Sequence, residues 1–209
     1  MIGRLIDGAA DLAEGAAYLV RREPRFAGAL ALTGPLPLRR KPAGFATLLD
    51  TIMGQQVSVA SADAIWRRLE GAGLTDPSAV AIASEDDLRG CGLSRQKIRY
   101  AQALARADID YAALAHAPDE VVIATLVALP GIGRWTAEIY AMFSLGRADV
   151  FAPGDLALQE AARILFGLAA RPDEKALRLM AADWAPWRAV AARALWAYYR
   201  VCKNREVVT

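Results

Sequence analysis

The sequence predicts an all-α protein. Alanine is abundant, and apolar residues recur at helical spacing, as in the series Phe45, Leu48, Leu49, Ile52 and Met53. Alternating runs of β-branched residues, which would indicate strands, are nearly absent. Together these patterns predict about ten helices.

Capping residues, glycines and prolines set the expected helix limits. Ser84 and Asp87 form a capping-box pattern, Ser94 can cap the next helix, and Pro118 suits a first helical turn. The first helix is expected to stop near Pro24, and a linker is expected over 34–37. The expected helices cover 6–22, 45–53, 60–69, a short segment after Ser84, 94–104, 118–127, 134 to about 145, 156–166, and roughly 172–184 and 186–201.

Length and composition suit one sizeable core or two lobes. The chain has 209 residues, of which 55% are hydrophobic. No apolar run reaches the roughly 18 residues that a membrane span needs. The acidic residues Asp7, Asp11 and Glu14 are unlike the start of a secretory signal. We therefore expect a cytoplasmic monomer with no membrane partner.

Charge and metal-binding residues exclude several classes of protein. The net charge of +2 gives only weak support for a nucleic-acid partner. The two cysteines, Cys91 and Cys202, lie far apart and predict neither a disulfide framework nor a metal cluster. With His116 as the only histidine, a zinc site or a Ser-His-Asp triad is not expected.

The most informative segment is Leu129-Pro130-Gly131-Ile132-Gly133, between two expected helices. Glycine permits a positive φ and the close approach of another chain. Backbone amides at the start of the following helix can bind an anion, and a DNA phosphate would fit. The alternative is an ordinary helix–helix turn that buries Ile132.

A longer stretch, Leu-Pro-Gly-Ile-Gly-Arg-Trp-Thr-Ala at 129–137, resembles the helix-hairpin-helix motif of a DNA glycosylase superfamily. Val-Phe-Ala-Pro-Gly-Asp at 150–155 matches the loop that carries the catalytic aspartate in that superfamily. The branch with the greatest similarity is the 3-methyladenine DNA glycosylase II family. Further matches are Ile-Met-Gly-Gln-Gln-Val-Ser at 52–58, Gly92-Leu93-Ser94 with Lys97-Ile98, Trp184-x-x-Trp187-Arg188, and Trp196, so the resemblance covers roughly residues 25–200.

This resemblance implies two helical lobes flanking a cleft, with the hairpin at their junction. The expected lobes are about 43–133, and 1–42 together with 134–209. It also implies excision of alkylated purine bases, such as 3-methyladenine, from double-stranded DNA. Gly131, Gly133, Arg134 and Thr136 would then contact DNA.

Asp155 is the candidate catalytic residue. Breaking a glycosidic bond develops positive charge on the sugar, which a nearby carboxylate stabilises. An alkylated base already carries positive charge and leaves without a general acid, so one carboxylate suffices. The alternative is that Asp155 only caps the next helix, and both roles are compatible.

By resemblance, Trp135, Tyr140 and Trp196 would line a base pocket, because aromatic faces attract a flat cationic base. The alternative is packing in the core. Gln56 would be the tip that fills the gap left by the flipped nucleotide. This departs from the leucine of some relatives, although glutamine can hydrogen-bond the partner base. The alternative for Gln56 is a simple turn.

No organic cofactor is expected, and an iron–sulfur cluster is excluded because its clustered cysteines are missing. The resemblance implies Na⁺ or K⁺ bound by the backbone carbonyls of Val127, Leu129 and Ile132. Relatives that also cut the strand carry a lysine where this chain has Trp135, so a glycosylase without lyase activity is expected. The rival reading is a non-catalytic helix-hairpin-helix module that only binds DNA.

Overall fold

The computed structural model describes residues 3–206, with side chains as far as residue 204. Over these residues the chain forms thirteen α-helices and one short 3-10 helix. The described segments contain no strand beyond an isolated antiparallel bridge between Leu5 and Arg147. The expected all-α class is therefore confirmed. Within the same range, no helix combines the length and the apolar character that crossing a bilayer requires.

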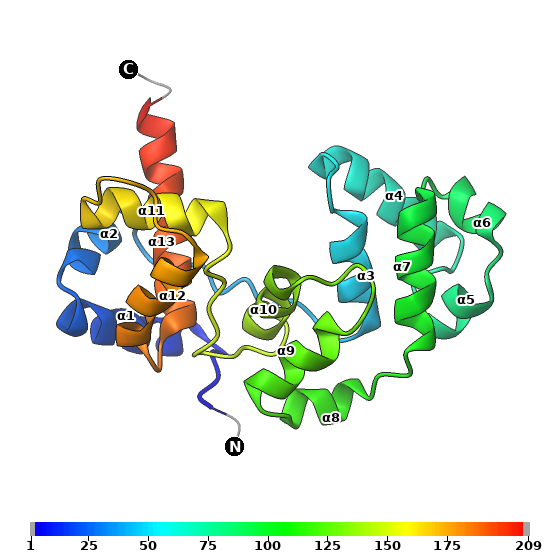
Figure 1. Cartoon of the computed structure of the whole chain (residues 1–209), viewed down its shortest axis with the longest axis horizontal. Helices are drawn as coiled ribbons and strands as arrows, with labels where there is room; N and C mark the ends of the chain where they lie inside the picture. Colours follow the sequence, from blue (N-terminus) through cyan, green and yellow to red (C-terminus); the bar gives the residue numbers. More distant parts are fainter. Residues whose placement is uncertain (1–2, 207–209) are drawn as a thin grey trace. The chain divides into compact units, whose positions relative to one another are not determined.

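The chain divides into two compact units (Figure 1). The central unit is 41–140, and the terminal unit combines 1–40 with 141–209. The divisions fall between residues 40 and 41 and between residues 140 and 141, the second of them inside helix α10 (Arg134–Phe143). The boundaries expected from the sequence, after residues 42 and 133, assigned all of that helix to the terminal unit instead.

The terminal unit is built around its last helix, α13 (Arg188–Glu206), which packs on α1, α2 and α11. In Figure 1 this orange-to-red helix lies against the blue and yellow helices. Phe26, Phe166 and Trp184 form an aromatic cluster beside it, with ring centroids 5.4–5.9 Å apart. The other helices of the unit are α1 (Ala9–Arg22), α2 (Arg25–Thr33), α11 (Leu156–Phe166), α12 (Glu174–Ala181) and the 3-10 helix η1 (Ala182–Trp184).

The central unit packs α3 against α4 and α7, and α5 against α7. The apolar series predicted from the sequence forms its core, since Leu48, Leu49, Ile52 and Met53 are fully buried. The helices of this unit before α10 are α3 (Phe45–Met53), α4 (Val59–Gly71), α5 (Pro77–Ile82), α6 (Glu85–Gly90), α7 (Arg95–Arg106), α8 (Tyr111–His116) and α9 (Asp119–Val127).

Helix starts agree with the capping residues. Ser84 and Asp87 form the predicted capping box of α6, and the Ser94 hydroxyl accepts from the Lys97 amide at the start of α7. The first helix begins at residue 9 rather than residue 6. There the Asp11 carboxylate accepts from the amides of Asp7 and Gly8, and these bonds lower its pKa.

Three helices were not expected from the sequence: α2, α5 and α8. Pro24 marks the expected end of the first helix, but it also directly precedes α2, where a missing N–H costs nothing. Pro77 occupies the first turn of α5 in the same way, after the cap Asp76. Helices α5 and α8 have six residues each, too few for a periodic pattern to be recognised.

Candidate active site and nucleic-acid interface

The segment 128–133 forms a tight hairpin between α9 and α10. The amide of Ile132 donates to the Leu129 carbonyl at 3.1 Å, and the amide of Ala137 donates to Gly133 at 3.1 Å. The Ile132 side chain is buried, which anchors the turn in the central unit. Gly133 and Arg134 are exposed at the start of α10, where the first amides of a helix lack helical partners. These exposed amides at the start of α10 are suited to binding an anion.

Two glycines of the hairpin have different environments. Gly131 has φ +87°, and a Cβ placed there would collide with the ring of Tyr100 on α7. Gly133 has no positive φ, and a Cβ placed there would have no atom within 4 Å. Gly131 therefore lets the hairpin lie against α7, whereas Gly133 leaves open space at the surface.

The other hairpin residues have mixed exposure. Trp135 is 43% exposed, so its ring is available at the surface. The Arg134 guanidinium is bound to the buried Glu138 carboxylate at 3.0 Å. The Thr136 side chain is only 4% exposed, and its backbone amide belongs to the first turn of α10. Tyr140 is also buried, and its hydroxyl accepts from the Gly44 amide at 2.8 Å. Burial raises the pKa of Tyr140.

The carbonyls considered for a monovalent cation follow the C-terminal end of α9. Val127 is the last residue of that helix, and Leu129 and Ile132 belong to the turn. Carbonyls at a helix C-terminus carry partial negative charge, which suits a cation. Among the described residues, no cluster of acidic, histidine and cysteine side chains could hold a metal ion.

Asp155 caps α11 in the terminal unit. Its Oδ1 atom accepts from the amides of Ala157 and Leu158 at 2.9 and 3.1 Å. The indole N–H of Trp196 on α13 donates to the same oxygen at 3.2 Å. The carboxylate is half-buried at the start of an eleven-residue helix. These three donors hold the Oδ1 atom in a fixed position at the start of α11.

The loop that carries Asp155 is held on several sides. Arg188, the first residue of α13, binds the Asp149 carboxylate with two bonds of 2.7 and 2.8 Å. The buried Gln159 amide donates to the Pro153 carbonyl at 2.9 Å. Further back, the amide of Ile6 donates to Gly146 at 2.7 Å. These bonds fix the backbone that carries the Asp155 carboxylate.

Trp196 is itself held by a stack of side chains. Its ring lies 5.8 Å from that of Phe143, and the Arg193 guanidinium lies 4.5 Å from the centroid of Phe143. Arg193 is 2% exposed and donates to the carbonyls of Ala189 and Met142. Burial, and then the neighbouring Arg40 and Arg39, lower the pKa of Arg193 to about 10.

Gln56 lies at the tip of the loop between α3 and α4. It is exposed and has φ +57°, a left-handed conformation that is uncommon for a residue with a side chain. Val57 and Val59 beside it are 39% and 78% exposed. We call residues 54–58 the tip loop. An exposed loop with an apolar flank agrees with a segment that enters another molecule.

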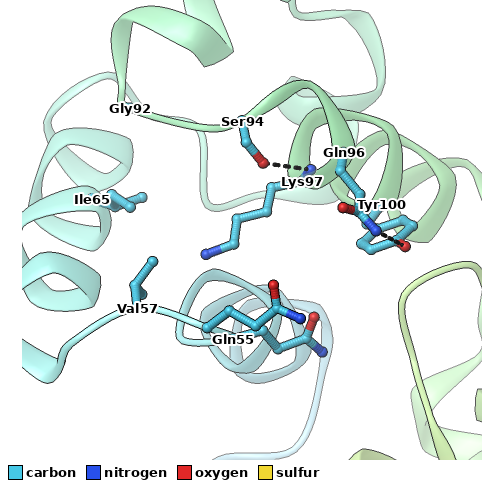
Figure 2. Close-up of a pocket in the computed structure, with 9 residues that line it drawn as sticks. Gln55, Val57, Ile65, Gly92, Ser94, Gln96, Lys97 and Tyr100 are labelled. Atoms are coloured by element: carbon cyan, nitrogen blue, oxygen red, sulfur yellow. Dashed lines mark hydrogen bonds between the residues drawn. The ribbon is translucent and has the colours of Figure 1, made fainter.

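A pocket of about 270 Å³ lies beside the tip loop (Figure 2). It is bordered by Gln55, Val57 and Ile65 on one side and by Ser94, Lys97 and Tyr100 of the α7 region on the other. The resemblance included Gln55 and Lys97 among the matching residues but gave neither a role, and Tyr100 was not among them. Their roles depend on contacts between helices far apart in the sequence, for which the sequence carries no periodic signal.

The expected site residues fall in both units. Asp155 and Trp196 meet in the terminal unit. Gln56, the hairpin, Trp135 and Tyr140 belong to the central unit. His116 is exposed at the end of α8, and Cys91 and Cys202 are free thiols.

Comparison with known proteins gives one consistent family. Residues 49–186 match the family described as HhH-GPD superfamily base excision DNA repair protein. A DNA-3-methyladenine glycosidase from Bacillus halodurans has a similar structure, with a TM-score of 0.82 and 34% identity over 89% of both chains. A 3-methyladenine DNA glycosylase from Schizosaccharomyces pombe, solved with abasic DNA, has a TM-score of 0.75 and 27% identity over 88% of this chain and 95% of its own.

Curated sequences agree with the structures. The DNA-3-methyladenine glycosylase 2 of Escherichia coli is 31% identical over 69% of this chain and 54% of its own length. The match to a Bacillus subtilis relative, also 31% identical over 57% of this chain, spans 43% of that relative. This chain thus corresponds to about half the length of these two curated relatives. It belongs to the HhH-GPD superfamily of base excision DNA repair proteins.

Proposed function

We propose that this protein is a DNA glycosylase that flips alkylated purines, such as 3-methyladenine, out of duplex DNA and hydrolyses their bond to the sugar. The observation that carries the proposal is the Asp155 carboxylate, which accepts three N–H bonds on one oxygen at the start of α11. The names of the similar glycosylases support the choice of alkylated purines.

The chemistry needs one carboxylate and one water molecule. The bond between C1′ and the base nitrogen breaks, and the base leaves as a neutral molecule with the bonding electrons. Asp155 would stabilise the positive charge that develops on the sugar. The water oxygen then bonds to C1′ and releases a proton, which leaves an abasic site. Preorganised donors hold the carboxylate in place, so little reorganisation is needed during the reaction.

The hairpin supplies a grip on DNA in this proposal. The backbone amides near Gly131, Gly133 and Arg134 would bind phosphates of the lesion strand, and the amide of Thr136 lies two residues beyond Arg134 in α10. The exposed Gln56 would fill the gap left by the flipped nucleotide. The exposed ring of Trp135 and the ring of Trp196 are the aromatic faces suited to a cationic base.

The decisive experiment measures free base released from methylated duplex DNA, without added metal or organic cofactor. The unsubstituted protein should release methylated purines, and Asp155→Asn should lower the single-turnover rate by at least about 100-fold. Asparagine keeps an oxygen that can cap α11, so the variant should still fold and bind DNA containing an abasic-site analogue. Binding by the parent without any release would favour a non-catalytic DNA-binding module.

We also propose that the enzyme leaves the DNA strand intact. Strand cleavage through the sugar needs an amine that forms an imine, and the indole of Trp135 cannot form one. The neighbouring Arg134 carries a guanidinium rather than an amine, and it is bound to Glu138. Borohydride added during the reaction should therefore trap no covalent complex. A trapped complex, or strand breaks without alkali or heat, would show that another amine acts.

A bound Na⁺ or K⁺ at the carbonyls of Val127, Leu129 and Ile132 is a further proposal. The end of α9 has the partial charge for it, and the ion would act by holding the turn and a phosphate rather than by chemistry. Affinity for undamaged duplex should fall when tetramethylammonium replaces K⁺ at constant ionic strength. Equal affinity in the two salts would argue against the ion.

A further inference from the structure

Two hydrogen bonds fasten the start of the tip loop to its surroundings within the central unit. On one side, the Lys97 ammonium donates to the carbonyl of Met53, the last residue of α3, at 2.6 Å. On the other, the Gln55 side-chain amide donates to the carbonyl of Gly131 in the hairpin at 3.0 Å. Figure 2 shows Lys97 reaching from α7 across the pocket towards the loop.

In the bond from Lys97, a charged ammonium donates to a neutral backbone carbonyl. The Met53 carbonyl belongs to the end of a helix, where a positive charge is favoured by the helix dipole. Lys97 forms no ion pair with any described residue, and burial lowers the pKa of its ammonium. A lysine that served only solubility would extend into water, so this arrangement indicates a holding role.

Tyr100, one turn after Lys97, completes the connection. Its ring lies against the Cα atom of Gly131, close enough to exclude any side chain there. Gln55 reaches the same residue from the tip loop. Helix α7 therefore contacts both the end of α3 and the hairpin, and Gln55 connects the start of the tip loop to the same hairpin.

The conformation of Gln56 needs such support. Its φ of +57° is disfavoured for a residue with a Cβ, and such conformations persist where the surroundings impose them. Gln56 is exposed, so its own side chain contributes little to holding it. The restraints lie just before it in the chain, where Lys97 binds the Met53 carbonyl and the Gln55 side chain binds the Gly131 carbonyl.

We propose that Lys97 and Gln55 are positioning residues that fix the tip loop in register with the hairpin. The phosphates gripped by the hairpin would then determine where Gln56 enters the duplex. This inference rests on the proposed function, because it assumes that the hairpin grips DNA and that Gln56 enters it. Neither residue is assigned contact with the base or the sugar.

The test compares Lys97→Met with Arg99→Met. Both variants lose one positive charge from α7, but Arg99 is exposed and only Lys97 holds the loop. Tip insertion is read from 2-aminopurine placed next to an abasic-site analogue, and base release from single-turnover rates. We expect the two variants to bind undamaged duplex within about twofold of each other. Lys97→Met should lose the insertion signal and release base about tenfold more slowly than Arg99→Met.

A double-mutant cycle separates positioning from general destabilisation. In a Gln56→Ala background, Lys97→Met should cause almost no further loss, because it acts through the tip that is already missing. Additive losses would overturn the proposal, as would normal insertion in Lys97→Met. Should Lys97→Met fail to fold, Gln55→Glu serves instead, since it places an acceptor against the Gly131 carbonyl at nearly unchanged size.

The readouts also keep the two proposals apart. Insertion beside an abasic-site analogue measures binding alone, so it tests the positioning role even if the parent protein releases no base. Loss of insertion in Lys97→Met, without any base release by the parent, would retain the positioning role and remove the glycosylase. Base release by the parent, together with normal insertion in both Lys97→Met and Gln55→Glu, would retain the glycosylase and remove the positioning role.

Discussion

Replacing each hairpin glycine by alanine should separate folding from DNA binding. At Gly131, a Cβ meets the Tyr100 ring at a distance that real structures do not show, and φ is +87°. The backbone conformation costs an L-residue roughly 1–2 kcal/mol, and overpacking costs about 1–3 kcal/mol. Gly131→Ala should therefore lower the free energy of unfolding by about 2–5 kcal/mol. In a chain of this size that lowers Tm by roughly 4–20 °C.

Gly133→Ala should leave the stability of the protein nearly unchanged and weaken DNA binding instead. A Cβ there touches nothing within 4 Å, so only the exchange of glycine for alanine before α10 affects stability, by at most about 1 kcal/mol. A methyl group on the exposed face would instead obstruct a phosphate, and affinity should fall roughly three- to tenfold for damaged and undamaged duplex alike.

Thermal unfolding followed by circular dichroism and fluorescence anisotropy with labelled duplex measure the two effects. If Gly131→Ala has the same Tm as the parent protein, the close packing of Tyr100 does not constrain the hairpin. If Gly133→Ala binds DNA as the parent does, phosphates do not approach at that position, and the anion site must lie elsewhere.

Two further substitutions test the terminal unit. Trp196→Phe keeps an aromatic ring but removes the N–H donor to Asp155 Oδ1, and it should slow single-turnover base release about tenfold with DNA affinity unchanged; an unchanged rate would remove that bond from the mechanism. Gly15→Ala places a Cβ 2.7 Å from Val190 and 2.8 Å from Trp187, so it should destabilise the protein by about 1–3 kcal/mol in urea. Gly28→Ala, on α2 with open space around it, is the matched control and should be neutral or slightly stabilising; equal effects of the two would contradict the packing argument.

Local sequence signals predicted much of the fold. The capping box of Ser84 and the cap of Ser94 act within four residues, so they could be recognised without tertiary information. The apolar series around Leu48 and Ile52 indicated both a helix and its buried face. Helix α2 was missed because a proline such as Pro24 can end one helix and also precede the start of the next.

The candidate site was less accessible to sequence reasoning. Resemblance singled out Asp155, but the bond to its oxygen from Trp196 joins residues that are 41 positions apart. The resemblance places Tyr140 in a base pocket, and in the structure its side chain is buried and its hydroxyl accepts from the Gly44 amide. Aromatic residues have the same appearance in a sequence whether they line a site or fill a core, so the sequence pattern alone does not distinguish the two roles.

The shared duty of Asp155 has a consequence for how this lineage can change. Its Oδ1 atom satisfies two amides at the start of α11 as well as the Trp196 indole. Loss of the cap lowers the stability of the protein by about 1 kcal/mol. Substitutions that remove the cap should therefore be selected against even where selection for repair has ceased. Descendants that abandon base excision should therefore retain asparagine, serine or threonine here, and their sequences would record a lost activity through a side chain that still caps the helix.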